Sequence, residues 1–193
     1  RDLVRSRGLG DVYKRQIKIQ VFFPDIYGMM RDREIRGVYC DMRRRKKRIM
    51  KVGGVLVKSR SQLDGIRESG KINTAVLDYV QQNICAGIST EEIDQWVYRL
   101  TTEMGAVPAP LNFEGFPKSV CTSLNSVVCH GIPDERVILK EGDIINVDVS
   151  TIYKGYFSDA SRTFCIGEVS ADKRRLVQAA KEACLLYTSP SPR

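Results

Sequence analysis

Two aspartates in the segment IINVDVSTIYKGYFSDASRTF, Asp148 and Asp159, are of the right type and spacing to do chemistry. β-type patterns flank Lys154–Gly155, and glycine suits a two-residue hairpin turn at this position. Such a hairpin places Asp159 opposite Ser150, and Asp148 is the next residue along on the same face. The spacing therefore predicts that the two carboxylates are diagonal neighbours on adjacent strands.

Diagonal neighbours on one face of an antiparallel pair have Cα atoms roughly 7–8 Å apart. Two such carboxylates can share metal ions that lie about 3.5–4 Å from each other, as in two-metal hydrolytic sites. Like charges at this separation repel unless a cation or a proton lies between them. The pattern predicts a metal pair or a shared proton, and the alternative is a solvated Asp159 with the hairpin shifted by one residue.

His130, in the string VVCHGIP, is the only histidine of the sequence. It is either a structural hydrogen-bonding residue beside a Gly/Pro turn or a catalytic residue. The string SVVCHG reads as a β-strand, and neighbouring strand residues face opposite ways, which disfavours a thiol–imidazole pair between Cys129 and His130. Phe113, Phe116 and Cys121 form either an apolar pocket near His130 or ordinary core.

The elements that must position these residues follow from periodicity. A helix is predicted from Ser61 to just before Gly87, and a second begins where Ser89 and Glu92 have the spacing of a capping box. Their apolar stripes are interpreted as core faces, with members Leu63, Ile66, Val76, Leu77, Val80, Ile84, Ile93, Trp96, Val97, Leu100 and Met104. Short strands follow in SVCTS, SVVCHG, DIINVDVS and GYFSDASRTFCIG, and a final helix starts near Ala171. The predicted fold class is mixed α/β (α+β), an antiparallel sheet with flanking helices.

Charge divides the 193-residue chain into unequal parts. The formal net charge is +8, yet residues 1–54 hold 16 Lys/Arg against 6 Asp/Glu, whereas residues 55–184 hold 14 against 17. We expect 1–54 to be a basic, non-native or disordered segment, 55–184 to be the folded domain and 185–193 to be an artefact-like tail. The basic run at 43–48 also supports an alternative, a non-catalytic module that binds RNA or the ribosome.

No apolar run approaches the roughly 18 residues of a membrane span. The six cysteines show no metal-binding or disulfide spacing, which is typical of reduced thiols in the cytoplasm. We therefore expect a cytoplasmic monomer that contacts neither membrane nor DNA.

Four strings together are highly specific: GIRESGKINTAVLD, PAPLNFEGFPKSVCTSLNSVVCHGIPDE, LKEGDIINVDVS and GYFSDASRTFCIG. Through them the region 55–184 closely resembles the N-terminal half of type I methionine aminopeptidases. The resemblance implies the pita-bread fold, in which two pseudo-symmetric halves surround a central antiparallel sheet with a dinuclear metal centre. It also implies metal-assisted removal of the N-terminal methionine from nascent peptides, with the ribosome as a further partner.

By this resemblance Asp148 is the bidentate ligand of one metal ion and Asp159 is the carboxylate shared by both ions. The cofactors would be two divalent cations, Mn, Fe, Co or Zn, which suit carboxylate ligands. The family takes its other ligands, one His and two Glu, from its C-terminal half. The chain contains no second histidine, so we expect a truncated and inactive fragment.

The resemblance also assigns the substrate side of the site. His130 is expected to contact the substrate near its scissile amide and leaving nitrogen. Phe113, Phe116 and Cys121 are expected to line the pocket for the methionine side chain, and Phe stands where many members have Tyr. Prolidase-like X-Pro peptidases share the fold but usually lack the VCHGIP context, and they are the less favoured relatives.

Overall fold

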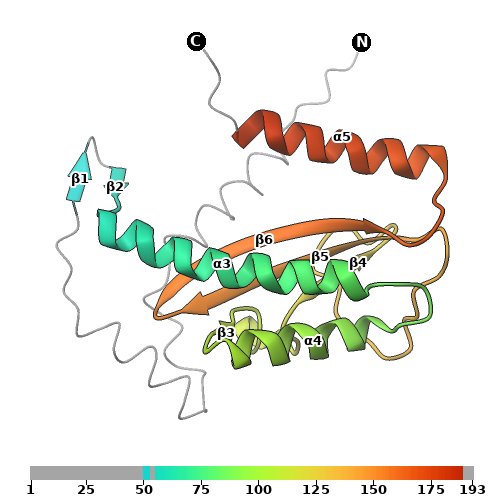
Figure 1. Cartoon of the computed structure of the whole chain (residues 1–193), viewed down its shortest axis with the longest axis horizontal. Helices are drawn as coiled ribbons and strands as arrows, with labels where there is room; N and C mark the ends of the chain where they lie inside the picture. Colours follow the sequence, from blue (N-terminus) through green and yellow to red (C-terminus); the bar gives the residue numbers. More distant parts are fainter. Residues whose placement is uncertain (1–49, 53–54, 189–193) are drawn as a thin grey trace. The chain divides into compact units, whose positions relative to one another are not determined.

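The computed structural model describes residues 50–52 and 55–188 of the chain (Figure 1). Most of the segment 1–54, including the basic run at 43–48, lies outside the described residues. Its described part is strand β1 (Met50–Val52), which pairs with β2 (Val55–Val57) in a short antiparallel hairpin.

Two capped helices precede the main sheet. Helix α3 spans Arg60–Asn83 and α4 spans Thr90–Glu103. The predicted capping box of α4 is confirmed, because the Ser89 hydroxyl accepts from the Glu92 N–H at 3.1 Å and Glu92 accepts from the Ser89 N–H at 2.8 Å. Helix α3 has a second capping box, two residues upstream of its predicted start, between Ser59 and Gln62. Such boxes satisfy backbone donors that a helix start leaves unpaired.

The main sheet is antiparallel and has β5 (Ile144–Tyr153) at its centre. Strand β6 (Tyr156–Cys165) pairs with β5 along its whole length. On the opposite edge, β3 (Val107–Pro108) and β4 (Cys121–Leu124) pair with β5 one after the other. The prediction of an antiparallel sheet with flanking helices is confirmed.

The predicted β5–β6 turn is also confirmed. Lys154 and Gly155 have φ values of 49° and 79°, the left-handed conformation that a two-residue type I′ turn requires. The turn pairs Tyr153 with Tyr156, and the register continues to Ile144 opposite Cys165.

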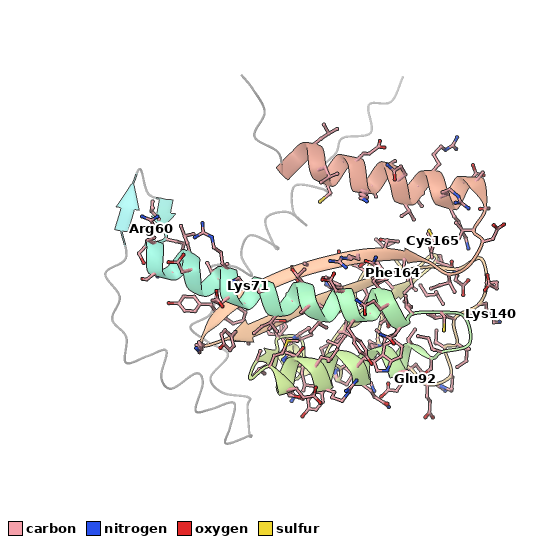
Figure 2. All side chains as sticks on the ribbon, in the orientation of Figure 1. Arg60, Lys71, Glu92, Lys140, Phe164 and Cys165 are labelled. Atoms are coloured by element: carbon pink, nitrogen blue, oxygen red, sulfur yellow. The ribbon has the colours of Figure 1, made fainter. Side chains whose placement is uncertain are left out.

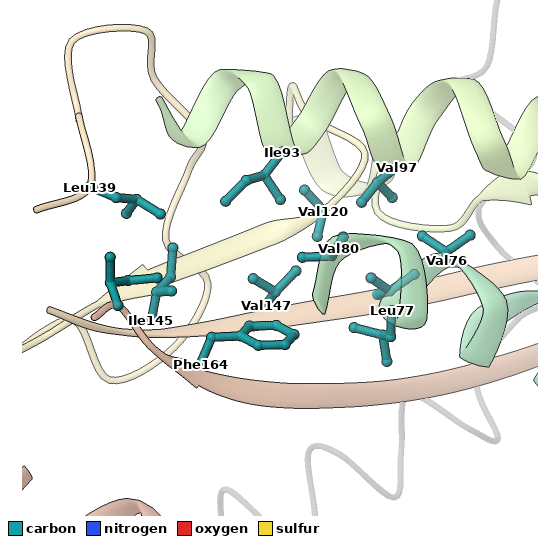
Figure 3. Packing of buried hydrophobic residues seen from close by; sticks show 12 residues of the cluster. Val76, Leu77, Val80, Ile93, Val97, Val120, Leu139, Ile145, Val147 and Phe164 are labelled. Atoms are coloured by element: carbon teal, nitrogen blue, oxygen red, sulfur yellow. The ribbon is translucent and has the colours of Figure 1, made fainter. Parts of the chain in front are cut away.

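Helices α3 and α4 cover one face of this sheet, and the core lies between them (Figure 3). Burial alternates at the end of β6, where Phe164 is buried and Cys165 is exposed. Figure 2 labels both residues on the strand. Of the predicted core stripes, Val76, Leu77, Val80, Ile93 and Val97 are buried in the cluster, and Ile84, Trp96 and Leu100 pack against it. Leu63 and Met104 are instead 41% and 40% exposed, and Ile66 is half-buried and not part of the cluster. The cluster comprises Val76, Leu77, Val80, Ile93, Val97, Val120, Leu139, Ile145, Val147, Val149, Phe164 and Ile166.

One predicted strand is wrong. Residues 126–131 form a loop, in which Val128 is 93% exposed and His130 has a φ of 55°. The loop returns to β4 at Gly131, where the Thr122 N–H donates to the Gly131 carbonyl at 2.8 Å. A Cβ at this position would lie 2.0 Å from the Thr122 carbonyl oxygen, so only glycine permits the close approach.

Helix α5 (Ala171–Thr188) confirms the predicted final helix and extends into the segment 185–193. Lys173 fixes its first turn, donating from Nζ to the Gly142 carbonyl at 2.6 Å and to Asn125 Oδ1 at 3.0 Å. Leu176 and Leu186 are 62% and 79% exposed. The helix therefore contributes little to the core of the described region.

Buried polar groups attach α3 to β5. Asn73, which is 1% exposed, donates from Nδ2 to the Val149 carbonyl at 2.8 Å and accepts from the Thr151 hydroxyl at 2.7 Å. Four residues earlier, the Ser69 hydroxyl lies 3.2 Å from the Thr151 carbonyl and 2.8 Å from the Ser158 hydroxyl. These bonds fix how α3 sits along the β5–β6 hairpin.

Replacing Asn73 by Ala should lower the free energy of unfolding by about 1–3 kcal/mol, because the buried Thr151 hydroxyl loses its acceptor. Urea unfolding of the full chain measures the change. Thr74→Ala is the matched control, since Thr74 is exposed and bonds only within its own helix. Equal stability losses in the two variants would contradict this role for Asn73.

Candidate metal centre

The β5–β6 hairpin brings the two predicted ligands together. Ser150 pairs with Asp159, and Asp148 pairs with Ser161, so the carboxylates are diagonal neighbours on the face away from the helices. The charges of Asp148 and Asp159 interact across the strand pair. The Ser150 hydroxyl donates to Asp159 Oδ1 at 2.5 Å. The predicted register is confirmed.

Asp148 shows the electrostatic cost of this arrangement. Burial first, then the neighbouring charge of Asp159 and the hydrogen bond between the two carboxyls, raise the pKa of Asp148 to about 6. An ionised carboxylate that loses water and faces a like charge favours protonation unless a cation neutralises it. The pair is therefore suited either to share a proton or to bind a divalent cation through hard oxygen ligands.

Cys121 lies directly across from Asp148, on β4. Its side chain is buried, and burial, followed by the charges of Asp148 and Asp159, raises the pKa of the thiol to about 12. A thiol with such a pKa stays protonated at neutral pH and is a poor nucleophile. Cys121 is thus a neutral, apolar wall beside the carboxylates.

The segment 109–120 bulges out between β3 and β4 on one edge of β5. It starts beside the aspartates, where the Ala109 N–H donates to the Ser150 carbonyl at 2.9 Å, and it ends at Cys121. The Phe113–Gly115 turn (η2) carries left-handed residues, and the Phe116 N–H donates to the Phe113 carbonyl at 2.8 Å. Phe113 and Phe116 are both half-buried on this loop.

His130 lies near the site on a separate loop. The neighbouring Gly131 is bonded to Thr122 and to the Ser123 hydroxyl, which holds His130 beside β4. The imidazole is exposed, and among the described contacts none joins it to Asp148 or Asp159. The structure therefore brings together the two aspartates and Cys121, and it places His130 on an adjoining loop without direct contact.

Helix α4 supplies residues that the sequence did not single out. Asp94 is buried, and its Oδ1 accepts from the Ser119 N–H at 2.6 Å, at the end of the bulged segment. Desolvation raises the pKa of Asp94. The signal was present in the pattern, because Asp94 follows Ile93 and precedes Val97 by three residues, which places a carboxylate on the apolar face of a helix.

In the part of the chain that the structure describes, no group of three or more His, Cys, Asp or Glu side chains could hold a metal ion. The two aspartates are the described donors at this place. Their mutual repulsion and their oxygen chemistry fit a divalent cation, although two carboxylates alone leave most of its coordination positions to other ligands.

Comparison with known proteins shows the family of this chain. A profile of metallopeptidase family M24 matches residues 64–188.

The chain belongs to metallopeptidase family M24.

Methionine aminopeptidase A of Synechocystis sp. is 44% identical over 127 residues, 66% of this chain and 50% of that protein. The crystal structure of methionine aminopeptidase from Rickettsia prowazekii matches 67% of this chain and 52% of that one, with 37% identity and a TM-score of 0.65. An Xaa-Pro dipeptidase from Bacillus anthracis matches 67% of this chain and 35% of its own, with 24% identity and a TM-score of 0.59, so it shares the fold.

These M24 relatives confirm the predicted pita-bread fold for the region that aligns with them. The chain spans about half the length of the Synechocystis and Rickettsia proteins. Among the described helices of this M24 chain, none has the length and apolarity to cross a bilayer.

Asp148→Asn should stabilise the metal-free chain above pH 6, by on the order of 2 kcal/mol. The raised pKa means that an ionised Asp148 destabilises the fold above about pH 6, and protonation removes this cost as the pH falls towards 4. Thermal unfolding with EDTA at pH 8 and pH 4 measures the stability gap between the Asp148→Asn variant and the parent chain. Asp172→Asn, on exposed α5, is the control. A gap that is the same at both pH values would contradict the prediction.

Proposed function

We propose that this chain is part of a methionine aminopeptidase, which hydrolyses the peptide bond after an N-terminal methionine. The observation that carries the proposal is the Asp148–Asp159 pair, which lies beside the loop of Phe113 and Phe116 and against Cys121. The identity of 44% to a methionine aminopeptidase over the same region supports it.

Asp148 and Asp159 would hold one or two divalent cations, with Mn, Fe, Co and Zn as candidates. Bound there, such a cation supplies Lewis-acid polarisation of the scissile carbonyl and lowers the pKa of a water molecule. Ser150 contributes by orienting Asp159 through its 2.5 Å hydrogen bond. The positive charge of a cation would also replace the proton that the carboxylate pair otherwise shares.

The remaining residues would bind and orient the substrate. Phe113, Phe116 and the neutral thiol of Cys121 offer apolar and polarisable contacts, which suit the unbranched thioether of methionine. The exposed imidazole of His130 is available to hydrogen-bond the substrate near its scissile amide. Nascent peptides would be the substrates, met in the cytoplasm near the ribosome by a monomeric enzyme.

Two other functions find less support. The RNA-binding alternative depends on residues 43–48, which lie outside the described residues, and the comparisons give it no support. An X-Pro peptidase function has only the shared fold in its favour, since the similar Xaa-Pro dipeptidase is 24% identical.

A chimera tests the proposed function. Residues 64–188 of this chain would replace the matching region of the Rickettsia methionine aminopeptidase, whose structure guides the junctions. With Mn²⁺ we expect methionine release from Met-Ala-Ser but not leucine release from Leu-Ala-Ser.

Within the chimera, Asp148→Asn should lower the rate of methionine release more than about 100-fold. The loss is large because the substitution removes a metal ligand itself, and not a residue that hydrogen-bonds to a ligand. Asp172→Asn is the matched control on exposed α5 and should be neutral. A folded chimera that cleaves neither peptide would contradict the proposal.

Metal binding can be measured on the chain itself. At pH 7.5, Mn²⁺ at ten times its dissociation constant should stabilise the fold by about 1.4 kcal/mol. Both Asp148→Asn and Asp159→Asn should abolish this stabilisation, whereas Ser161→Ala, on the same sheet face, should retain it. Equal stabilisation of all four proteins would show that Mn²⁺ binds elsewhere.

A further inference from the structure

Two loops border the aspartate pair, and both are fastened to the same end of one helix. The first two turns of α4 contain Thr90, Glu91 and Asp94. We define these three residues as the α4 brace. The first loop, 109–120, carries Phe113 and Phe116, and the second, 125–138, carries His130.

The first loop is held at its C-terminal end. Asp94 Oδ1 accepts from the Ser119 N–H at 2.6 Å. Glu91 forms an ion pair with Lys118, and these side chains are only 22% and 24% exposed. Two consecutive residues, Lys118 and Ser119, are therefore tied to α4 just before the chain enters β4 opposite Asp148.

The second loop is held by Thr90, which precedes Glu91 on α4. The Thr90 hydroxyl donates to the Asp134 carbonyl and accepts from the Asp134 N–H, both at 3.0 Å. The Thr90 N–H donates to the Val137 carbonyl at 2.9 Å. Together with Gly131 on β4, these bonds fasten the chain that follows His130.

The helix itself is a rigid support. Ile93 and Val97 of α4 are fully buried in the core. Side chains on successive turns of one face keep a constant spacing, so both loops have one common reference. A rigid element that supports a site by hydrogen bonds improves its precision without touching the substrate.

We propose that the α4 brace sets the spacing between the Phe113–Cys121 side and the His130 side of the site, and that Asp94 and Thr90 are positioning residues. The reading of those two sides as a substrate pocket rests on the proposed function. The brace does not rest on the proposed function, because the bonds between α4 and the two loops are present whatever the site binds.

Protection of Cys121 reports on the first loop. In the full, tag-free chain, pulse labelling with N-ethylmaleimide and mass spectrometry compares buried Cys121 with exposed Cys85 and Cys165. Asp94→Ala should raise Cys121 labelling about 10-fold, because the Ser119 N–H loses its acceptor. Asp94→Asn keeps a carbonyl oxygen at the same place and should stay within about 2-fold of the parent.

Val97→Ala is the matched control, since it weakens the same helix from its buried face and removes no hydrogen bond or ion pair to either loop. Its Cys121 labelling should rise less than that of Asp94→Ala, with exposed Cys85 and Cys165 as the reference in both variants. Equal labelling in Asp94→Ala and Val97→Ala, or no rise in Asp94→Ala, would overturn the proposal. If Asp94→Ala does not fold, Lys118→Met removes only the ion pair and should give a rise of about 3-fold, and no rise would again overturn it.

The single histidine reports on the second loop. The imidazole proton resonances of His130 are unambiguous in the tag-free chain. Thr90→Val should shift them, whereas Thr90→Ser, which retains the hydroxyl, and Val97→Ala should not. An unchanged spectrum in Thr90→Val would overturn the role of Thr90 as a positioning residue. Both readouts are independent of catalysis, so an inactive chimera would contradict the proposed function and leave the brace intact.

Discussion

The register of the β5–β6 hairpin is the constraint on which the site depends. A shift of one residue would turn either Asp148 or Asp159 to the opposite face, because side chains alternate along a strand. The register is held at one end by the type I′ turn at Lys154–Gly155. Along the hairpin it is held by Val147 and Val149, whose burial against the helices leaves Asp148 on the other face.

The two long helices contribute differently to this arrangement. Helix α3 fixes the hairpin, through Asn73 and Ser69 and their bonds to the backbone of β5. Helix α4 fixes the loops that border the aspartates, through Asp94 and Thr90. In both helices, polar side chains on the buried face are satisfied by backbone groups of the partner segment, which gives each contact a single geometry. Apolar packing alone would allow small displacements at similar energy.

Features with a local cause were predicted from the sequence. The hairpin register follows from its turn and from alternation, and the start of α4 follows from the Ser89–Glu92 box. The diagonal aspartates followed in turn, because they depend only on that register. Their roles as metal ligands, and those of His130 and the pocket residues, stay predictions.

Features with a tertiary cause were missed. The β-branched string at 126–131 resembles a strand, yet its path is decided by the approach of Gly131 to the Thr122 carbonyl, which no local pattern reveals. The bond from Ser119 to Asp94 likewise joins segments that are far apart in sequence. The position of Asp94 on the apolar face of α4 indicates that its carboxylate has a buried hydrogen-bond donor, but not that the donor is Ser119.

The local origin of the aspartate pair has a consequence for folding kinetics. A hairpin closed by a two-residue turn forms in about 1–10 μs, before contacts between distant segments such as α3 and β5. We therefore expect the two carboxylates to meet early, before the helices dock on the sheet. Their repulsion opposes this early step, and protons or cations in the medium relieve it. We therefore expect the folding rate of this chain to depend on solution pH and on divalent ions.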